Sequence, residues 1–492
     1  MMRLQPHVAM DSSETLFSWL GRLAAIHAGL DLVPFLNDLQ IKSREIEIGA
    51  DGTHARLADL TGVSTAQMAR QHYFSVDSRR LRFRAETFAS EFAPKVHRMV
   101  CPLCLEEDGG SDPVRGPRGW RCRLLWTVRY CAACPKHGVG LVSPVNKEMG
   151  YVPAHDTARA IGARLPELIA KTAPRPVTSL QLWVARRMME QRGDGWLDGQ
   201  DIDQAAKATE MLGVVLAHGP MPNMNLMSAQ DWDQAWEAGF EVTSRGAEAI
   251  MGALEGLTIR GRASTLSFKG PQANLGRLYQ WLAFNEASGW RAGPIRDLVR
   301  EHIIDNYNVG AGDVVLGEAV LRRRTHTAIS LHRATGINSR TAANLMEDVG
   351  RPGGVMDAAD AEKLAADYEA SIPLFHVPKY LNCSRVHAQL LAEARIIRPM
   401  GKPGKCRLHS RYLPTELDSF LDQLIARTVD IEITGDFADF AKCAMKVWVP
   451  SPRIVQAVLD GTLSKVALAP GVPGYLGIRV SVSEVKEKLR SD

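Results

Sequence analysis

Apolar residues recur at helical spacing through much of the chain. In residues 13–30 they repeat every three or four positions, which predicts an amphipathic helix capped by Ser12 or Ser13, with a buried face made of Leu16, Trp19, Leu20, Leu23 and Ile26. The same periodicity predicts helices in residues 177–191, 232–257 and 294–307. A stretch rich in Gly and Asp, residues 192–203, predicts a loop or hinge. The pattern as a whole predicts a mainly α fold.

The first third of the chain also has the pattern of a helix-turn-helix, in residues 55–73. Gly62 stands where the turn needs a positive φ, and Ser64 can cap the second helix. Met68 would then face inward. Many such helix pairs only pack against the rest of a protein, so this unit alone says little about nucleic acid.

Two further segments repeat this pattern nearer the C-terminus. Residues 327–350 place Gly336 at the turn and Asn338 at the cap, and residues 377–399 resemble the excisionase-like type. A weaker echo occupies residues 452–466, and a small hairpin is predicted to follow it at 471–480.

Recurrence of the unit favours nucleic-acid recognition more than any single copy does. Side chains at outward positions of the second helices are the candidate base-reading groups. These are Thr65, Gln67, Arg70, Ser339, Arg340, Asn344, Ser384, Arg385 and Gln389.

At 492 residues the chain is too long for one core. We predict an N-terminal helical and helix-turn-helix domain (1–95), a zinc ribbon (96–145), a helical scaffold (146–315), a helix-turn-helix (316–360), an excisionase-like unit (361–430) and a small winged unit (431–492). No apolar run reaches membrane-spanning length, and the N-terminus lacks the apolar core of a signal peptide. The sequence therefore predicts a cytoplasmic bacterial protein that has no membrane partner.

The net charge of +4 is too small to indicate a partner by itself. Any contact with nucleic acid must then come from local clusters of arginine, for which a solvated surface is the alternative interpretation. The clusters are Arg79, Arg80, Arg82 and Arg84; Arg115, Arg118, Arg121 and Arg123; and Arg322, Arg323 and Arg324.

The cysteines are gathered in one short stretch. Five of the eight fall within residues 101–134, whereas Cys383, Cys406 and Cys443 are scattered. In a cytosolic chain such a cluster indicates a metal site rather than disulfides.

The spacing of these cysteines suits a tetrahedral zinc site. Cys101 and Cys104 form one CxxC pair, and the second pair is either Cys131 with Cys134 or Cys134 with His137. Four protein ligands predict one structural Zn²⁺ that holds a small ribbon together. A catalytic zinc would need an open coordination position, and the HxE signature of the zinc deaminases is absent from the sequence.

Three sequence motifs resemble the TniQ family of transposon target-selection adaptors, whose larger relatives include TnsD. Glu14-Thr15-Leu16-Phe17-Ser18-Trp19-Leu20-Gly21-Arg22-Leu23-Ala24 is similar to the family's ESLxSWLxRLA start. Residues 98–108, RMVCPLCLEED, resemble its RxCPxCLxED knuckle, and Trp126 with residues 134–138, CPKHG, resembles its W…CPxHG ending. The resemblance covers about the first third of the chain. It implies the ligand set Cys101, Cys104, Cys134 and His137, with Cys131 in reserve.

The same resemblance implies a non-enzymatic adaptor that binds target DNA and recruits an AAA+ ATPase of the TnsC or TniB type. Relatives also suggest a homodimer. The sequence agrees on catalysis, since it has no GxxxxGK[ST], GxGxxG or HExxH motif. The alternatives are a subunit docked on a CRISPR effector such as Cascade, which lends its guide RNA, and a zinc-containing transcription regulator.

Overall fold

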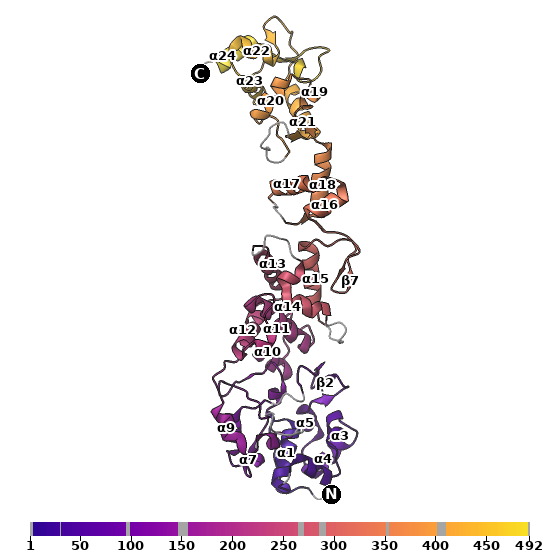
Figure 1. The fold of residues 1–492 in the computed structure, drawn as a ribbon, viewed down its shortest axis with the longest axis vertical. Helices are drawn as coiled ribbons and strands as arrows, with labels where there is room; N and C mark the ends of the chain where they lie inside the picture. The colour runs from indigo at the N-terminus through magenta and orange to yellow at the C-terminus, as the bar shows by residue number, and fades with distance from the viewer. Residues whose placement is uncertain are drawn as a thin grey trace. The chain divides into compact units, whose positions relative to one another are not determined.

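The structure is a computed structural model, and it describes residues 3–29, 31–94, 99–145, 156–263, 270–284, 292–350, 354–400 and 410–490. The described chain is mainly helical with short strands, as Figure 1 shows, which confirms the predicted fold class. It divides into two compact units. Unit 1 is Met1–Ile303 with Val314–Glu318, and unit 2 is Ile304–Asp313 with Ala319–Asp492.

Unit 1 begins with five helices around one apolar core. They are α1 (Leu16–His27), α2 (Leu32–Asp38), α3 (Ser43–Ile48), α4 (Thr53–Thr61) and α5 (Thr65–Arg70). The predicted buried face of α1 is confirmed for Leu16, Trp19, Leu20 and Leu23. The predicted cap is wrong: Thr15 caps α1, because its hydroxyl accepts the Ser18 N–H at 3.2 Å.

The predicted pair α4 and α5 has the expected helix-turn-helix geometry. Gly62 ends α4 with φ +77°, Ser64 accepts the Gln67 N–H at 3.1 Å, and Met68 is fully buried. Each of these features satisfies a requirement of the tight turn between two packed helices.

A small antiparallel sheet and the cysteine region follow. The sheet has the order β1 (Phe74–Ser75), β2 (Arg80–Phe83), β3 (Glu86–Ala89). The cysteine region contains α6 (Pro102–Gly109), α7 (Gly116–Gly119), the 3-10 helix η1 (Leu124–Thr127) and the hairpin β4 (Ala133–Cys134) and β5 (Val139–Gly140). Helices α8 (Thr157–Ile161) and α9 (Leu165–Ala170) complete it.

The remainder of unit 1 is also mainly helical. It contains α10 (Ser179–Met188), α11 (Ile202–His218), α12 (Ala229–Thr243), α13 (Ala247–Ala263), α14 (Pro271–Phe284) and α15 (Ile295–Asn306), with the short strands β6 (Val314–Val315) and β7 (Glu318–Ala319). The loop predicted at 192–203 joins α10 to α11. Residues 232–257 are two helices rather than one continuous stretch, because the chain turns at Gly246 with φ +90°.

Two glycines bring α11 and α12 into contact. A Cβ atom built on Gly213 would stand 1.8 Å from the carbonyl oxygen of Ala235, and one built on Gly239 would stand 2.0 Å from that of Thr209. The two backbones therefore approach too closely at this crossing for any larger residue.

Unit 2 begins with the second helix-turn-helix predicted from the sequence. It consists of β8 (Thr325–His326), α16 (Ala328–Thr335), α17 (Ser339–Asp348), β9 (Met356–Asp357) and α18 (Ala358–Ala370), and β8 pairs with β9. Gly336 ends α16 with φ +81°, and the Asn338 side chain accepts the Arg340 N–H at 2.9 Å. The turn and the cap are thus where the sequence predicts them.

The last part of unit 2 packs around a single core from Leu374 to Leu489. The units predicted at 361–430 and 431–492 share this core. Its elements are β10 (Ile372–Pro373), α19 (Val377–Leu381), α20 (Arg385–Glu393), β11 (Arg411–Tyr412), α21 (Pro414–Ile425), β12 (Phe437–Ala438), α22 (Phe440–Val447), α23 (Ser451–Leu459), β13 (Val466–Leu468), β14 (Ile478–Ser481) and α24 (Val482–Leu489).

The helix-turn-helix that the sequence weakly indicates at 452–466 is shifted in the structure. Residues 451–459 are the second helix of a pair whose first helix, α22, the sequence pattern missed. The hairpin predicted at 471–480 begins earlier, because β13 pairs with β14 from Val466. Cys406 lies outside the described residues.

Within the described residues, no single helix is long and apolar enough to cross a membrane. Helices α1 and α2 pass a test of length and composition only when they are joined across a bend of 76°.

Candidate metal centre

The four residues chosen as ligands converge on one point. Cys101 precedes α6 and Cys104 lies in its first turn, whereas Cys134 ends β4 and His137 lies in the turn to β5. That turn closes with a hydrogen bond from the Gly138 N–H to the Cys134 carbonyl at 2.9 Å. A helix start and a hairpin tip thus face each other.

The distances between the ligand atoms suit a tetrahedral ion. All four lie within 4.8 Å of one another. The Cys104 and Cys134 sulfurs are 3.7 Å apart, and His137 Nδ1 is 3.4 Å from the Cys101 sulfur and 3.3 Å from the Cys104 sulfur. A zinc ion bound at about 2.3 Å by sulfur and about 2.0 Å by nitrogen gives S–S edges of about 3.8 Å and S–N edges of about 3.5 Å. The cluster can therefore hold a metal ion with little rearrangement.

Hydrogen bonds between the sulfurs shift the pKa values of the thiols within this cluster in opposite directions. The pKa of the Cys134 thiol is lowered far below its usual range because its sulfur accepts hydrogen bonds from Cys101 and Cys104. The pKa of Cys104 is raised in turn by its hydrogen bonds with Cys101 and Cys134. One sulfur is thus already favoured as the thiolate, which is the form that binds metal.

A carboxylate outside the cluster orients the imidazole. Glu107 Oε1 lies 3.1 Å from His137 Nε2, so that Nδ1 faces the sulfurs, and Lys136 pairs with the same carboxylate. Such a carboxylate–histidine contact is typical of protein metal sites. Ligand spacing alone does not single out Glu107, although it stands inside the RMVCPLCLEED motif; its position three residues after Cys104, one helical turn away, is the signal that could have indicated it.

The reserve ligand Cys131 does not join the cluster. Its side chain lies in a different apolar core, with Tyr130 and Val128, and burial raises the pKa of its thiol to about 12. A neutral buried thiol of this kind behaves as a small apolar side chain.

The start motif, residues 14–24, is hydrogen-bonded to the cysteine region together with its neighbour Ser13. Glu14 accepts hydrogen bonds from Arg22 Nε at 2.9 Å and from the Ser18 hydroxyl at 2.9 Å, and Arg22 Nη2 lies 2.7 Å from its other oxygen. The Ser18 hydroxyl in turn accepts the Cys122 N–H at 2.8 Å. The Leu124 N–H donates to the Ser13 carbonyl at 2.7 Å. The motif's polar residues are therefore a buried structural network, a role that the sequence pattern did not reveal.

The candidate DNA-reading residues fall into two groups. On α5, Thr65 is exposed, but Gln67 donates to the Met10 carbonyl at 3.2 Å and Arg70 pairs with Glu190. These last two side chains are engaged within unit 1.

The candidates on α17 and α20 are more open. Ser339, Arg340 and Asn344 are all exposed, and Arg340 and Asn344 lie one turn apart on the same face of α17. On α20, Arg385 is exposed and Gln389 is half-buried, while Ser384 is exposed and caps the helix by accepting the His387 N–H at 3.1 Å.

Several arginines of the predicted basic clusters form ion pairs with acidic side chains of the same chain. Arg80 pairs with Asp77, Arg123 with Asp108 and Arg324 with Asp305. Arg84 lies 4.0 Å from Glu190. These clusters are therefore less available to phosphate than their sequence suggests.

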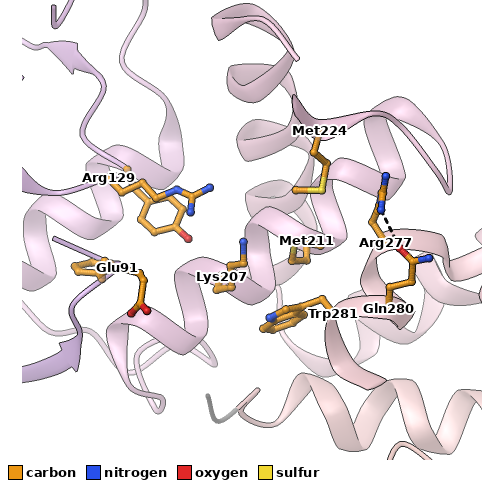
Figure 2. A pocket seen from close by; sticks show the side chains of 10 residues that line it. Glu91, Arg129, Lys207, Met211, Met224, Arg277, Gln280 and Trp281 are labelled. Carbon is orange, nitrogen blue, oxygen red and sulfur yellow. Dashed lines mark hydrogen bonds between the residues drawn. The ribbon is translucent and has the colours of Figure 1, made fainter. Parts of the chain in front are cut away.

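Unit 1 also contains a cavity of about 410 Å³, shown in Figure 2. Glu210 is fully buried and shares its carboxylate between Arg129 and Lys207, while Arg277 bonds to Gln280 and to the Pro222 carbonyl. The cavity lining combines charged and apolar side chains. The lining residues are Glu91, Phe92, Arg129, Tyr130, Lys207, Met211, Met224, Arg277, Gln280 and Trp281.

Comparison with known proteins and family models identifies one part of the chain. No curated protein matches the chain. The TniQ family model matches residues 5–141, which include the start motif, the α4–α5 pair and all four clustered ligands. A TniQ domain implies a transposition-associated adaptor role, and the family is not catalytic. Residues 5–141 of this chain are thus a TniQ domain.

Proposed function

We propose that this protein is a non-enzymatic target-selection adaptor in DNA transposition. It binds target DNA and recruits an AAA+ ATPase of the TnsC or TniB type, which regulates the transposase. The observation that carries the proposal is the TniQ domain match over the residues that bring Cys101, Cys104, Cys134 and His137 together. In this proposal the protein acts in the bacterial cytoplasm.

The bound ion is one structural Zn²⁺. Three thiolates and an imidazole are a soft, tetrahedral ligand set that zinc prefers, and a full set of four leaves no open position for chemistry. The ion would hold α6 against the β4–β5 hairpin, and the TniQ domain would then supply a rigid surface for partner proteins.

DNA recognition is assigned to unit 2. The α17 face with Arg340 and Asn344 is exposed, whereas Gln67 and Arg70 on α5 are engaged within unit 1. Basic side chains would position the protein on phosphates, and the amide and guanidinium groups would read base edges. The α4–α5 pair is then a packing element or a protein-binding one.

The test is a selection with the zinc-loaded full chain on genomic fragments and random duplexes at near-physiological salt, followed by sequencing of the bound fraction. We expect one enriched motif, and we expect Arg340→Ala together with Asn344→Ala to abolish the enrichment. Thr65→Ala, another exposed position on a second helix, is the matched control and should leave it intact. Salt-sensitive background without enrichment would contradict autonomous targeting and favour the alternative in which a guide-RNA complex brings the adaptor to DNA.

A further inference from the structure

Residues 372–489 contain the same order of elements twice. The first copy runs β10, α19, α20, β11 and α21, and the second runs β12, α22, α23, β14 and α24. In each copy the two strands pair antiparallel, β10 with β11 and β12 with β14, and they enclose a helix pair. In the second copy, β13 extends the sheet as a wing.

The buried positions of the two copies coincide at a spacing of 66 residues. Helices α20 and α23 begin at 385 and 451 and end at 393 and 459. Every member of the following pairs is buried and apolar, although the size of the side chain differs within several pairs: Leu374 and Phe440, Val377 and Cys443, Leu381 and Val447, Ala388 and Ile454, Leu391 and Ala457, Ile397 and Leu463.

The turns between the helices coincide as well. Asn382 follows α19 with φ +54°, and Trp448 follows α22 with φ +57°. Left-handed backbone at equivalent positions is what a tight helix–helix turn requires, and asparagine adopts it readily, whereas a bulky residue does so rarely. We propose that residues 372–489 are a tandem pair of helix-turn-helix units, of which the second carries a wing, and that the α22–α23 unit binds double-stranded DNA through the face around Trp448.

The two copies are locked together by the wing of the second copy. The Asn382 side chain donates to the Pro473 carbonyl at 2.6 Å, and the Leu476 N–H donates to the Asn382 carbonyl at 3.2 Å. The Tyr475 ring lies 5.6 Å from His387 of α20 and 4.9 Å from Phe440 of α22, measured between ring centroids. The turn of the first copy, at Asn382, is thus covered by the loop between β13 and β14. Helices α20 and α23 are thereby held in a fixed mutual position.

The second turn is open and its surroundings are basic. Trp448 is 84% exposed and Met445 is 70% exposed. Residues 440–459 contain three exposed basic side chains, Lys442, Lys446 and Arg453, and no Asp or Glu. Asp439 and Asp460 flank them, and Lys442 lies 3.6 Å from the Asp439 carboxylate. An exposed face with a surplus of basic side chains and an aromatic side chain is suited to a polyanion.

An exposed tryptophan in left-handed backbone gains nothing from packing, so its conformational cost calls for another use. In helix-turn-helix proteins the first helix and the turn lie along the DNA backbone while the second helix enters the major groove. The indole N–H of Trp448 and the ammonium of Lys446 would there donate to phosphates, and Arg453 and Gln456 would lie on the outward face of α23.

This inference rests on the proposed DNA binding, and the experiment separates the two. The full chain is titrated with a mixed-sequence duplex of about 40 base pairs, long enough for two adjacent half-sites. Binding is followed by fluorescence anisotropy at salt concentrations from about 50 to 200 mM. The variants are Lys446→Gln, Arg453→Gln and Trp448→Gly, with Lys171→Gln and Leu226→Ala as controls, since both control side chains are exposed in unit 1.

We expect Lys446→Gln and Arg453→Gln each to reduce the slope of log K against log salt by about 0.9, the value for one lost phosphate contact. Trp448→Gly should weaken binding by about tenfold, as expected for one lost hydrogen bond to a charged group, without lowering the melting temperature, because glycine adopts the left-handed turn without strain. Trp448→Phe should lose less affinity than Trp448→Gly, because it keeps an aromatic ring at the DNA. Both controls should bind as the unmodified chain does.

Unchanged slopes and affinities in all three variants, with binding by the unmodified chain intact, would overturn the inference and leave the proposed function standing. The exposed tryptophan would then belong to a protein interface. Absence of any duplex binding by the unmodified chain at the lowest salt would overturn the proposed DNA binding and this inference together.

Discussion

The ligand set of the metal centre can be tested by separating two neighbouring cysteines. Cys104→Ser removes one of the four clustered ligands, while Cys131→Ser changes a buried thiol that spacing alone would allow as a ligand. Both substitutions replace sulfur by oxygen at a buried position, so they are matched in chemistry. Only the first should affect the metal.

The magnitude follows from the fit of the cluster. The sulfur–sulfur separation of 3.7 Å is within a few tenths of the tetrahedral edge of about 3.8 Å, so binding needs little rearrangement. Structural zinc then contributes an apparent binding free energy of about 10–16 kcal/mol, which becomes folding free energy for the segment that the ion ties together. Loss of one thiolate should weaken affinity by more than 100-fold, about 2.7 kcal/mol, because removal of an outer-sphere partner alone weakens it about 10- to 100-fold.

The assay is metal content after gel filtration, combined with competition against a chromophoric chelator. We expect about one zinc per chain in the unmodified protein and in Cys131→Ser, and a large loss in Cys104→Ser. Hydrogen exchange over residues 99–145 should rise in Cys104→Ser only, since the ion holds α6 to the hairpin. Equal metal content in Cys104→Ser and the unmodified protein, or a loss in Cys131→Ser, would refute the assignment.

Three further predictions concern stability. Gly213→Ala should destabilise unit 1 by about 1–3 kcal/mol or more, measured by thermal melting, since its Cβ would stand 1.8 Å from a carbonyl oxygen; an unchanged melting temperature would contradict the close helix crossing. Burial lowers the pKa of His72 to about 4, so the neutral imidazole's contribution to the free energy of unfolding is present above pH 6.5 and is lost as the pH falls toward 4. The loss of stability is at most about 3 kcal/mol, and an NMR titration that gave His72 a pKa near 6.5 would contradict this. Burial alone would raise the pKa of Glu484, but hydrogen bonds from Lys488 and two backbone N–H groups lower it to about 2, so unit 2 should lose stability as pH falls from 4.5 toward 2, and Glu484→Gln should flatten that dependence in urea melts.

Sequence periodicity was sufficient for the helix-turn-helix units whose turns use the expected residue types. Gly62 and Gly336 adopt positive φ, and Ser64 and Asn338 cap the following helices, because local backbone chemistry fixes those positions. The α22–α23 pair was missed for the opposite reason. Trp448 stands where a glycine or asparagine is expected, so the turn carries no local signal.

The metal ligands show where spacing stops being informative. The choice between Cys131 and His137 came from the resemblance to the TniQ family, because both lie three residues from Cys134. The structure separates them by direction: His137 lies in the hairpin turn that faces α6, whereas Cys131 points into the core shared with Tyr130. Which side of a short strand faces the partner element depends on tertiary packing, and that is absent from the spacing.

The hydrogen-bonded contact between α1 and residues 122–124 makes the TniQ domain indivisible. Glu14, Ser18 and Arg22 are separated from Cys122 by about a hundred positions, yet they form one buried network with it. A genetic exchange that replaced the cysteine-rich segment without the first helix would leave the Glu14 carboxylate and the Cys122 amide to find new partners. The C-terminal edge of residues 5–141 is no free boundary either, because one core joins residues 81–131 to residues 180–236. Unit 2 has a separate core, so in the proposed function it is the part whose exchange would redirect the adaptor.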